Sequence, residues 1–164
     1  LIYLVTKFNS FVLLYFKFKL NRFIGMSNIF HLAIPAGSLK KSIPFYSDIL
    51  GCKLGENEEG KWQDINFWGN ELTLHETEPK IEKGPERERH QVEMGKVCIP
   101  HFGIHLDWDN YLTVKANVKK TIGFLDKPYT RFKNQTTEQE TFFVEDTNFN
   151  VIEIKSVKGN FYKS

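Results

Sequence analysis

Three side chains with the chemistry of metal ligands stand at corresponding places in this sequence. His31 and His101 each head a short apolar segment, and Glu153 lies inside the apolar run at 151–154. Two neutral imidazoles and one carboxylate bind Fe(II), Mn(II) or Zn(II) and leave coordination positions open for a substrate or for oxygen. A carboxylate between branched apolar residues is costly to bury unless it is paired or binds a metal. We therefore predict that His31, His101 and Glu153 are the protein ligands of one divalent ion.

The elements that must position these residues occur twice, in the order β-α-β-β-β. In the first half the strands and the helix are expected at 30–35, 39–50, 53–55, 62–68 and 71–76. In the second half they are expected at 101–108, 110–123, 127–133, 141–145 and 150–157. Period-two alternation marks the strands, and apolar stripes at helical spacing mark the helices. The duplication predicts an α+β fold with two small open sheets side by side and a cleft between them.

Local signals refine this pattern at three points. Ser38 is the expected N-cap of the first helix, and Gly69-Asn70 is the expected turn of a hairpin. The candidate buried positions of the second helix are Leu112, Ala116, Val118 and Ile122.

Two kinds of segment fall outside the repeat. Residues 1–25 contain no Asp or Glu, and their longest apolar run, 11–16, is far shorter than the roughly 20 residues needed to span a bilayer. We interpret 1–25 as a leader or extension. Residues 77–99 are rich in charge and are interpreted as a linker loop. The remaining boundaries are a first module at 26–76, a second module at 100–158 and a tail at 159–164.

Composition excludes several classes of function. The 164 residues fit one compact domain or two small modules that share a core. A formal charge of only +2 argues against a nucleic-acid or membrane-surface partner and leaves a small-molecule substrate. Cys52 and Cys98 lack metal-type spacing, and free thiols in a reducing cytoplasm are favoured over a disulfide. The sequence contains no phosphate-binding glycine loop and no nucleophile elbow.

Several motifs carry a resemblance to a known superfamily. The segments 30–35, 42–46 and 49–52 are similar to the opening of glyoxalase/bleomycin-resistance/extradiol-dioxygenase proteins, the vicinal oxygen chelate superfamily. The segment 143–153 resembles its closing pattern F-x-x-D-P-x-G-x-x-x-E, with Thr147 for the proline and Phe149 for the glycine. The resemblance covers about 29–156. It implies two paired βαβββ modules, a half-barrel cleft with a metal site, and a homodimer, because many relatives pair as dimers.

A subgroup of extradiol-type dioxygenases is more similar still. It shares Pro100-His101-Phe102-Gly103 leading to Asp107-Trp108-Asp109, and Arg131-Phe132-Lys133 followed by Glu138-Gln139. This implies a dioxygenase using Fe(II) or Mn(II), with Zn(II) or Ni(II) as alternatives, on a small substrate of catechol type. The superfamily also uses one cleft for other reactions. A glyoxalase-type lyase or isomerase and a non-catalytic small-ligand-binding protein therefore stay open.

The duplication provides an internal test of the ligand number. Setting 70–74 against 150–154 places Thr73 opposite Glu153. Glyoxalase I enzymes resemble this layout but carry a carboxylate at the first-half position. Thr73 is a poor metal ligand and is assigned to substrate binding. This favours three protein ligands, unless His75, which shares the face of Thr73, fills the position.

An extradiol-type reaction needs an acid–base group beside the metal. His105 shares the face of His101 at a spacing of four, and His75 is a second candidate. Tyr129, a further catalytic candidate, alternates with Arg131 on one strand, where the two side chains are suited to orient a substrate anion. The competing interpretations are packing of His105 and Tyr129 in the core and an ion pair from Arg131 to a nearby glutamate.

Overall fold

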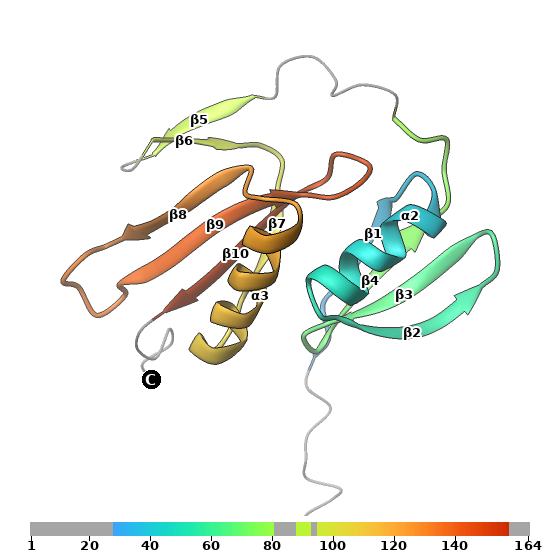
Figure 1. Ribbon diagram of the computed structural model, residues 1–164, viewed down its shortest axis with the longest axis horizontal. Coiled ribbons are helices and arrows are strands. Elements are labelled where there is room, and N and C mark those ends of the chain that lie inside the picture. The colour runs from blue at the N-terminus through green and yellow to red at the C-terminus, as the bar shows by residue number, and fades with distance from the viewer. Residues whose placement is uncertain (1–27, 81–87, 93–94, 158–164) are drawn as a thin grey trace, which may run out of the picture.

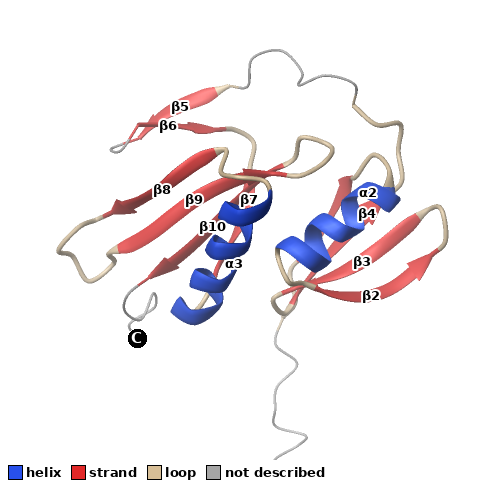
Figure 2. Ribbon diagram, viewed as in Figure 1, coloured by secondary structure: helices blue, strands red, loops and turns tan. Residues whose placement is uncertain are grey.

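Two βαβββ modules lie side by side in the computed structural model, which describes residues 28–80, 88–92 and 95–157 (Figures 1 and 2). The α+β fold with two open sheets is confirmed. The expected leader at 1–25 and tail at 159–164 lie outside the described residues. Within the described ranges, no helix has the length and apolar character needed to cross a membrane.

The first module forms a four-stranded sheet in the order β1-β4-β3-β2, with β1 parallel to β4. Its elements are β1 (His31–Pro35), α2 (Leu39–Pro44), η1 (Phe45–Ile49), β2 (Lys53–Glu58), β3 (Trp62–Phe67) and β4 (Asn70–His75). The turn between β3 and β4 is made by Trp68 and Gly69, both with positive φ, one residue earlier than expected. That conformation matches the right-handed twist of a hairpin.

The second module repeats this arrangement, with strand order β7-β10-β9-β8 and β7 parallel to β10. Its elements are β7 (Phe102–His105), α3 (Trp108–Thr121), β8 (Asp126–Arg131), β9 (Gln139–Glu145) and β10 (Val151–Val157). Ala33 pairs with Thr73 in the first module, and Gly103 pairs with Glu153 in the second. The two registers therefore make Thr73 and Glu153 equivalent, as the sequence comparison predicted.

A hairpin that the sequence did not predict lies between the modules. It consists of β5 (Arg89–Val92) and β6 (Gly95–Cys98), in the region expected to be a linker loop. Cys98 packs in a small apolar cluster with Phe143 and Val151 of the second sheet. An ion pair of 3.1 Å joins Arg89 Nη1 to Asp126 Oδ1. The hairpin thus covers part of the second sheet.

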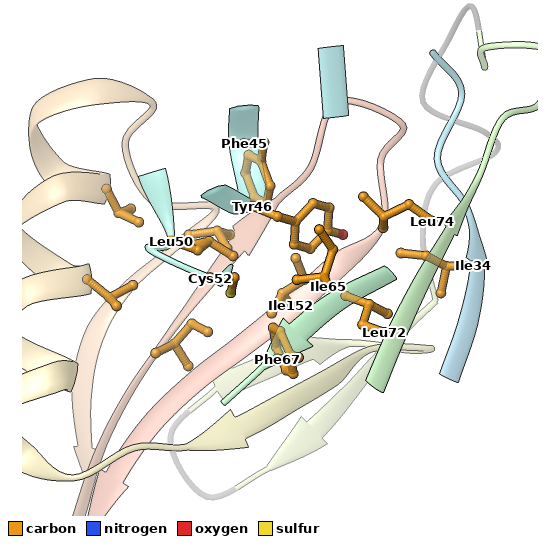
Figure 3. Close-up of a cluster of buried hydrophobic side chains, with 14 of the residues drawn as sticks. Ile34, Phe45, Tyr46, Leu50, Cys52, Ile65, Phe67, Leu72, Leu74 and Ile152 are labelled. Carbon is orange, nitrogen blue, oxygen red and sulfur yellow. The ribbon is translucent and has the colours of Figure 1, made fainter. Parts of the chain in front are cut away.

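The helix-covered faces of both sheets contribute to one apolar core. Figure 3 shows Ile152 of β10 beside Tyr46, Ile65 and Leu72 of the first module. Polar contacts also cross between the modules. The Tyr46 hydroxyl donates to Asp146 Oδ2 at 2.8 Å. The modules are therefore fixed relative to each other by a shared core and by buried hydrogen bonds.

The start of α2 differs in detail from the prediction. Ser38 is at the N-cap position but makes no side-chain capping bond. The Leu39 amide instead donates to Glu76 Oε2 at 2.6 Å, so a residue that follows β4 caps the helix. Pro44 has no amide hydrogen, and the chain continues from it as the single π-helical turn η1.

The buried face of α3 also differs from the prediction. The helix begins at Trp108, because Asp107 Oδ1 accepts a hydrogen bond of 2.9 Å from the Asn110 amide and caps it. Its buried residues are Tyr111, Val114 and Val118. The prediction was correct for Val118 and wrong for Leu112, Ala116 and Ile122, which are exposed.

Candidate metal centre

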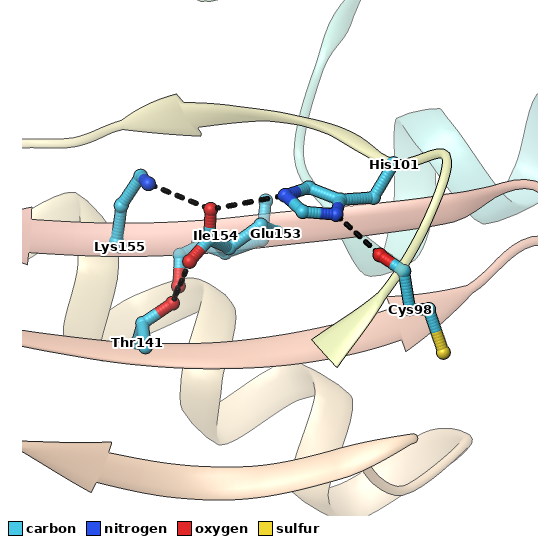
Figure 4. A network of polar contacts seen from close by, with 6 residues as sticks. All are labelled: Cys98, His101, Thr141, Glu153, Ile154 and Lys155. Carbon is cyan, nitrogen blue, oxygen red and sulfur yellow. Dashed lines mark hydrogen bonds and ion pairs between the residues drawn. The ribbon is translucent and has the colours of Figure 1, made fainter. Parts of the chain in front are cut away.

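Glu153 is a buried carboxylate on the face of β10 opposite the shared core. Only 5% of the residue is exposed, whereas its neighbours Ile152 and Ile154 point into the core. Its Oε1 accepts a hydrogen bond of 2.9 Å from Thr141 Oγ1. Its Oε2 lies 2.6 Å from Lys155 Nζ (Figure 4). The negative charge is therefore held in a defined polar environment.

His101 presents one ring nitrogen to this carboxylate. Its Nδ1 lies 2.6 Å from the Cys98 carbonyl oxygen, which can only accept, so Nδ1 is the nitrogen that donates and Nε2 is the nitrogen left to bind a metal (Figure 4). Nε2 is 3.6 Å from Glu153 Oε2, too far for a hydrogen bond. Two ligands at about 2.1 Å from one ion are separated by at most about 4.2 Å, so the pair fits a shared ion. The carbonyl contact is also typical of metal-binding histidines.

His31 begins β1 of the first module and contacts a different glutamate. Its Nδ1 is 2.5 Å from Glu71 Oε1 in the first module, and its side chain is 56% exposed. In the part of the chain that the structure describes, no three His, Cys, Asp or Glu residues come close enough to hold a metal. One chain therefore brings together His101 and Glu153 but does not add His31.

Thr73 and His75 lie on β4 of the first module. Thr73 is buried, and its hydroxyl donates to Asp64 Oδ1 at 2.6 Å. His75 is exposed at the end of the strand. It pairs in register with Pro35, as Lys155 pairs with His105, so it occupies the first-module counterpart of Lys155. Sequence reasoning missed Asp64.

His105 ends β7 beside the candidate centre. Its partner in the register is Lys155 of β10. Burial lowers the pKa of His105, the charge of Lys155 lowers it further, and the charge of Glu153 acts in the opposite direction. The ring is therefore neutral at pH 7 and is able to accept a proton.

Tyr129 and Arg131 lie farther along the second sheet. Tyr129 pairs with Thr141 and packs against the apolar cluster beneath the β5–β6 hairpin. Arg131 pairs with Gln139, four residues along β9 from Phe143, the partner of Glu153. At about 3.3 Å per residue this places Arg131 roughly 13 Å along the strand from the Glu153 position. Arg131 is not brought beside the candidate centre within one chain.

Two features next to Glu153 were missed in the sequence although signals for them exist. Lys155 follows Glu153 by two residues and so shares its strand face. Gly103 pairs with Glu153, and a Cβ atom built on Gly103 would lie 2.1 Å from the Glu153 carbonyl oxygen. Glycine therefore allows β7 to lie close to the strand that carries the carboxylate.

A cavity of about 430 Å³ borders the centre at the junction of the modules. His101 is part of its wall. Most of the lining is apolar and comes from both modules, including Leu32, Ile34, Phe102 and Val151. Lys80 adds one positive charge. The cavity has the size and character of a site for a small, largely apolar molecule.

Comparison with known proteins places this arrangement in a wider group. The model of the Glyoxalase/Bleomycin resistance protein/Dioxygenase superfamily matches residues 28–154. A glyoxalase/bleomycin resistance protein/dioxygenase from Alicyclobacillus acidocaldarius is 28% identical, with a TM-score of 0.60 over 80% of this chain and 92% of that chain. No curated protein matches the sequence.

Two further solved structures share the fold. A glyoxalase/dioxygenase from Nostoc punctiforme is 18% identical, with a TM-score of 0.59 over 81% of this chain and 92% of that chain. The fosfomycin resistance protein FosX from Listeria monocytogenes is 15% identical, with a TM-score of 0.52 over 84% and 95%. Proteins with different activities thus share this architecture.

Proposed function

Since the chain belongs to the Glyoxalase/Bleomycin resistance protein/Dioxygenase superfamily, we propose that it is a metal-dependent enzyme of extradiol-dioxygenase type. The observation that carries the proposal is the 3.6 Å pair of His101 Nε2 and Glu153 Oε2. A histidine and a carboxylate in this arrangement suit Fe(II) or Mn(II), with Zn(II) or Ni(II) as alternatives. When bound, the ion would supply Lewis-acid positions for two neighbouring oxygens of a catechol-type substrate.

The third ligand in this proposal is the partner subunit's His31. Among the described residues, β1 and β7 are the edge strands of their sheets, so one side of each forms no strand ladder there. Ile29 and Phe30, just before His31, are large apolar residues that are exposed in the single chain. A two-fold homodimer in which β1 of one chain meets β7 of the other would complete two equivalent centres. The partner's Thr73 and His75 would enter each centre with it.

The surroundings of His101 support a small substrate. The apolar cavity of about 430 Å³ has the size for a single-ring molecule and borders the proposed ligand. In the proposed reaction His105 accepts the substrate proton, because its lowered pKa keeps the ring neutral. The catalytic role of Tyr129, which packs against the apolar cluster beneath the β5–β6 hairpin, stays a prediction. The assignment of Arg131 to substrate binding stays a prediction.

We place the enzyme in the cytoplasm. Cys52 and Cys98 are both buried free thiols, and burial raises the pKa of Cys52 to about 12. Such a thiol is unreactive and is compatible with a reducing compartment.

A second candidate function is binding of a small ligand without a metal. The observation in its favour is the Lys155–Glu153 ion pair, which already neutralises the buried carboxylate. A glyoxalase-type lyase is less favoured, because Thr73 stands at the position where glyoxalase I enzymes carry a carboxylate ligand. Its hydroxyl already donates to Asp64.

Anaerobic reconstitution with Fe(II) tests the proposal. The wild-type protein is expected to hold one ion per chain and to consume oxygen with a member of a catechol panel. Turnover of a hemithioacetal under nitrogen would support the lyase instead. Small-ligand binding retained in a metal-free His101→Ala variant would support the binding protein.

Variants of the three proposed ligands are compared with a variant of an exposed histidine outside the site. His31→Ala, His101→Ala and Glu153→Ala are each expected to lose the ion. His90→Ala is a matched control, because His90 also forms an exposed contact with a glutamate, Glu88, at 2.6 Å. Full metal content in all three site variants would refute the shared site.

A further inference from the structure

We propose that Lys155 is a built-in counter-cation that occupies Glu153 in the metal-free protein and must leave it when the ion binds. Lys155 would thereby set the metal affinity of the centre. The inference rests on the proposed function, because it concerns the same carboxylate.

The geometry assigns the lysine and the metal to the same oxygen. Lys155 Nζ lies 2.6 Å from Glu153 Oε2. That oxygen is also the one that faces His101 Nε2, at 3.6 Å. The other carboxylate oxygen, Oε1, is occupied by the hydroxyl of Thr141 at 2.9 Å. An ion shared by His101 and Glu153 would therefore approach Oε2, where the ammonium now lies (Figure 4).

The Lys155–Glu153 ion pair and a metal ion bound to Glu153 exclude each other for electrostatic reasons. A divalent cation and an ammonium group on one carboxylate oxygen repel each other strongly in a partly buried site. Without either cation, the carboxylate would be buried with no counter-charge, which is a costly arrangement. Lys155 provides that charge when no metal is bound. Lys155 has about 20% of its side chain exposed, so a path to solvent is available on release.

The first module shows what the position looks like without the carboxylate. The counterpart of Glu153 is Thr73, and the counterpart of Lys155 is His75, which is exposed. The lysine therefore accompanies the glutamate and is not a general feature of the repeat.

Metal affinity of Lys155→Met tests the inference. Mn(II) binding is measured at pH 8 by calorimetry and by the electron paramagnetic resonance of free Mn(II). Because one competing positive charge is removed beside a dication, the affinity is expected to rise about tenfold. Equal or weaker binding than wild type would overturn the inference.

The matched control is Lys115→Met. Lys115 forms an ion pair of 2.5 Å with Glu140, and its side chain is about 30% exposed. It belongs to α3, which packs on the opposite face of the second sheet. The variant removes the same charge from the same module, and its Mn(II) affinity is expected to equal that of wild type. A rise equal to that of Lys155→Met would reduce the effect to net charge and overturn the inference.

A measurement on the wild-type protein avoids dependence on variant folding. The acetylation rate of Lys155 by a water-soluble active ester is followed by mass spectrometry with and without Mn(II). Release from Glu153 is expected to raise this rate severalfold, and an unchanged or lower rate would overturn the inference. Absence of Mn(II) binding in wild type and in Lys155→Met would instead refute the proposed metal site itself.

Discussion

Tyr46→Phe removes one hydroxyl that joins the two modules. The ring is fully buried, and its hydroxyl donates to Asp146 Oδ2 at 2.8 Å. Asp146 lies between β9 and β10, just before the strand that carries Glu153. Burial, and secondly Asp146, raise the pKa of Tyr46 well above its usual value, so the hydroxyl stays a donor throughout the neutral range. The substitution leaves the ring in place and tests this single bond.

The expected loss follows from what remains around Asp146. A hydrogen bond to a charged group contributes about 1.5–3 kcal/mol to the free energy of unfolding. Asp146 Oδ2 keeps a bond of 2.8 Å from Asn150 Nδ2, and Oδ1 keeps bonds from two backbone amides. The carboxylate is therefore not left without partners, and the lower half of the range, about 1.5–2 kcal/mol, is expected. For a chain of this size that lowers Tm by about 3–8 °C.

Differential scanning calorimetry and urea unfolding at pH 7 measure this loss. Tyr111→Phe is the control, because the Tyr111 hydroxyl donates to Glu140 Oε1 at 2.8 Å within the second module. Both variants are expected to lose stability, but only Tyr46→Phe should broaden the transition, because it weakens the coupling between modules. An unchanged Tm in Tyr46→Phe would refute the role given to this bond.

Three further changes probe the second sheet. Glu153→Gln is expected to abolish Mn(II) binding and to lower the stability of the metal-free protein by about 1–3 kcal/mol, measured by urea unfolding, because Lys155 loses its counter-charge. Gly103→Ala would place a Cβ 2.1 Å from the Glu153 carbonyl oxygen, so urea unfolding should show a loss of about 1–3 kcal/mol or more; wild-type stability would refute the close approach. The folded pKa of His105 is lowered, so its stabilising effect is present above about pH 6.5 and is lost as the pH falls through the lowered value. The Tm of wild type should therefore fall more between pH 7.5 and pH 5 than the Tm of His105→Gln, as measured by thermal unfolding at both pH values.

The repeat could be predicted because its signals are local. Strand alternation and the turn residues of each half fix the element order, and the equivalent registers of Thr73 and Glu153 follow from aligning the halves. The buried face of α3 could not be fixed in this way. Both a stripe through Leu112 and one through Tyr111 have helical spacing. The second is buried because Tyr111, Val114 and Val118 pack in the shared core, where the Tyr111 ring contacts Phe142 of β9, which is a tertiary contact.

Features of the site depend on tertiary structure to different degrees. The two-residue spacing predicts that Lys155 and Glu153 share one face of the strand. Their ion pair, however, depends on the burial of that face in the folded protein. In the described residues His31 contacts Glu71 and is not part of the pair formed by His101 and Glu153, a difference that depends on tertiary packing and that no motif encodes. The β5–β6 hairpin is likewise held by contacts of Cys98 with distant residues of the second sheet.

Subunit complementation tests the central claim, a metal centre shared between two chains. His31→Ala and Glu153→Gln are mixed, dissociated and reassembled, and Mn(II) bound per chain is measured before and after. Each homodimer is expected to bind no ion. Half of the randomly reassembled dimers would contain both variants, each with one intact centre, which restores about a quarter of the wild-type binding. No restored binding, or full binding by either variant alone, would contradict the shared centre.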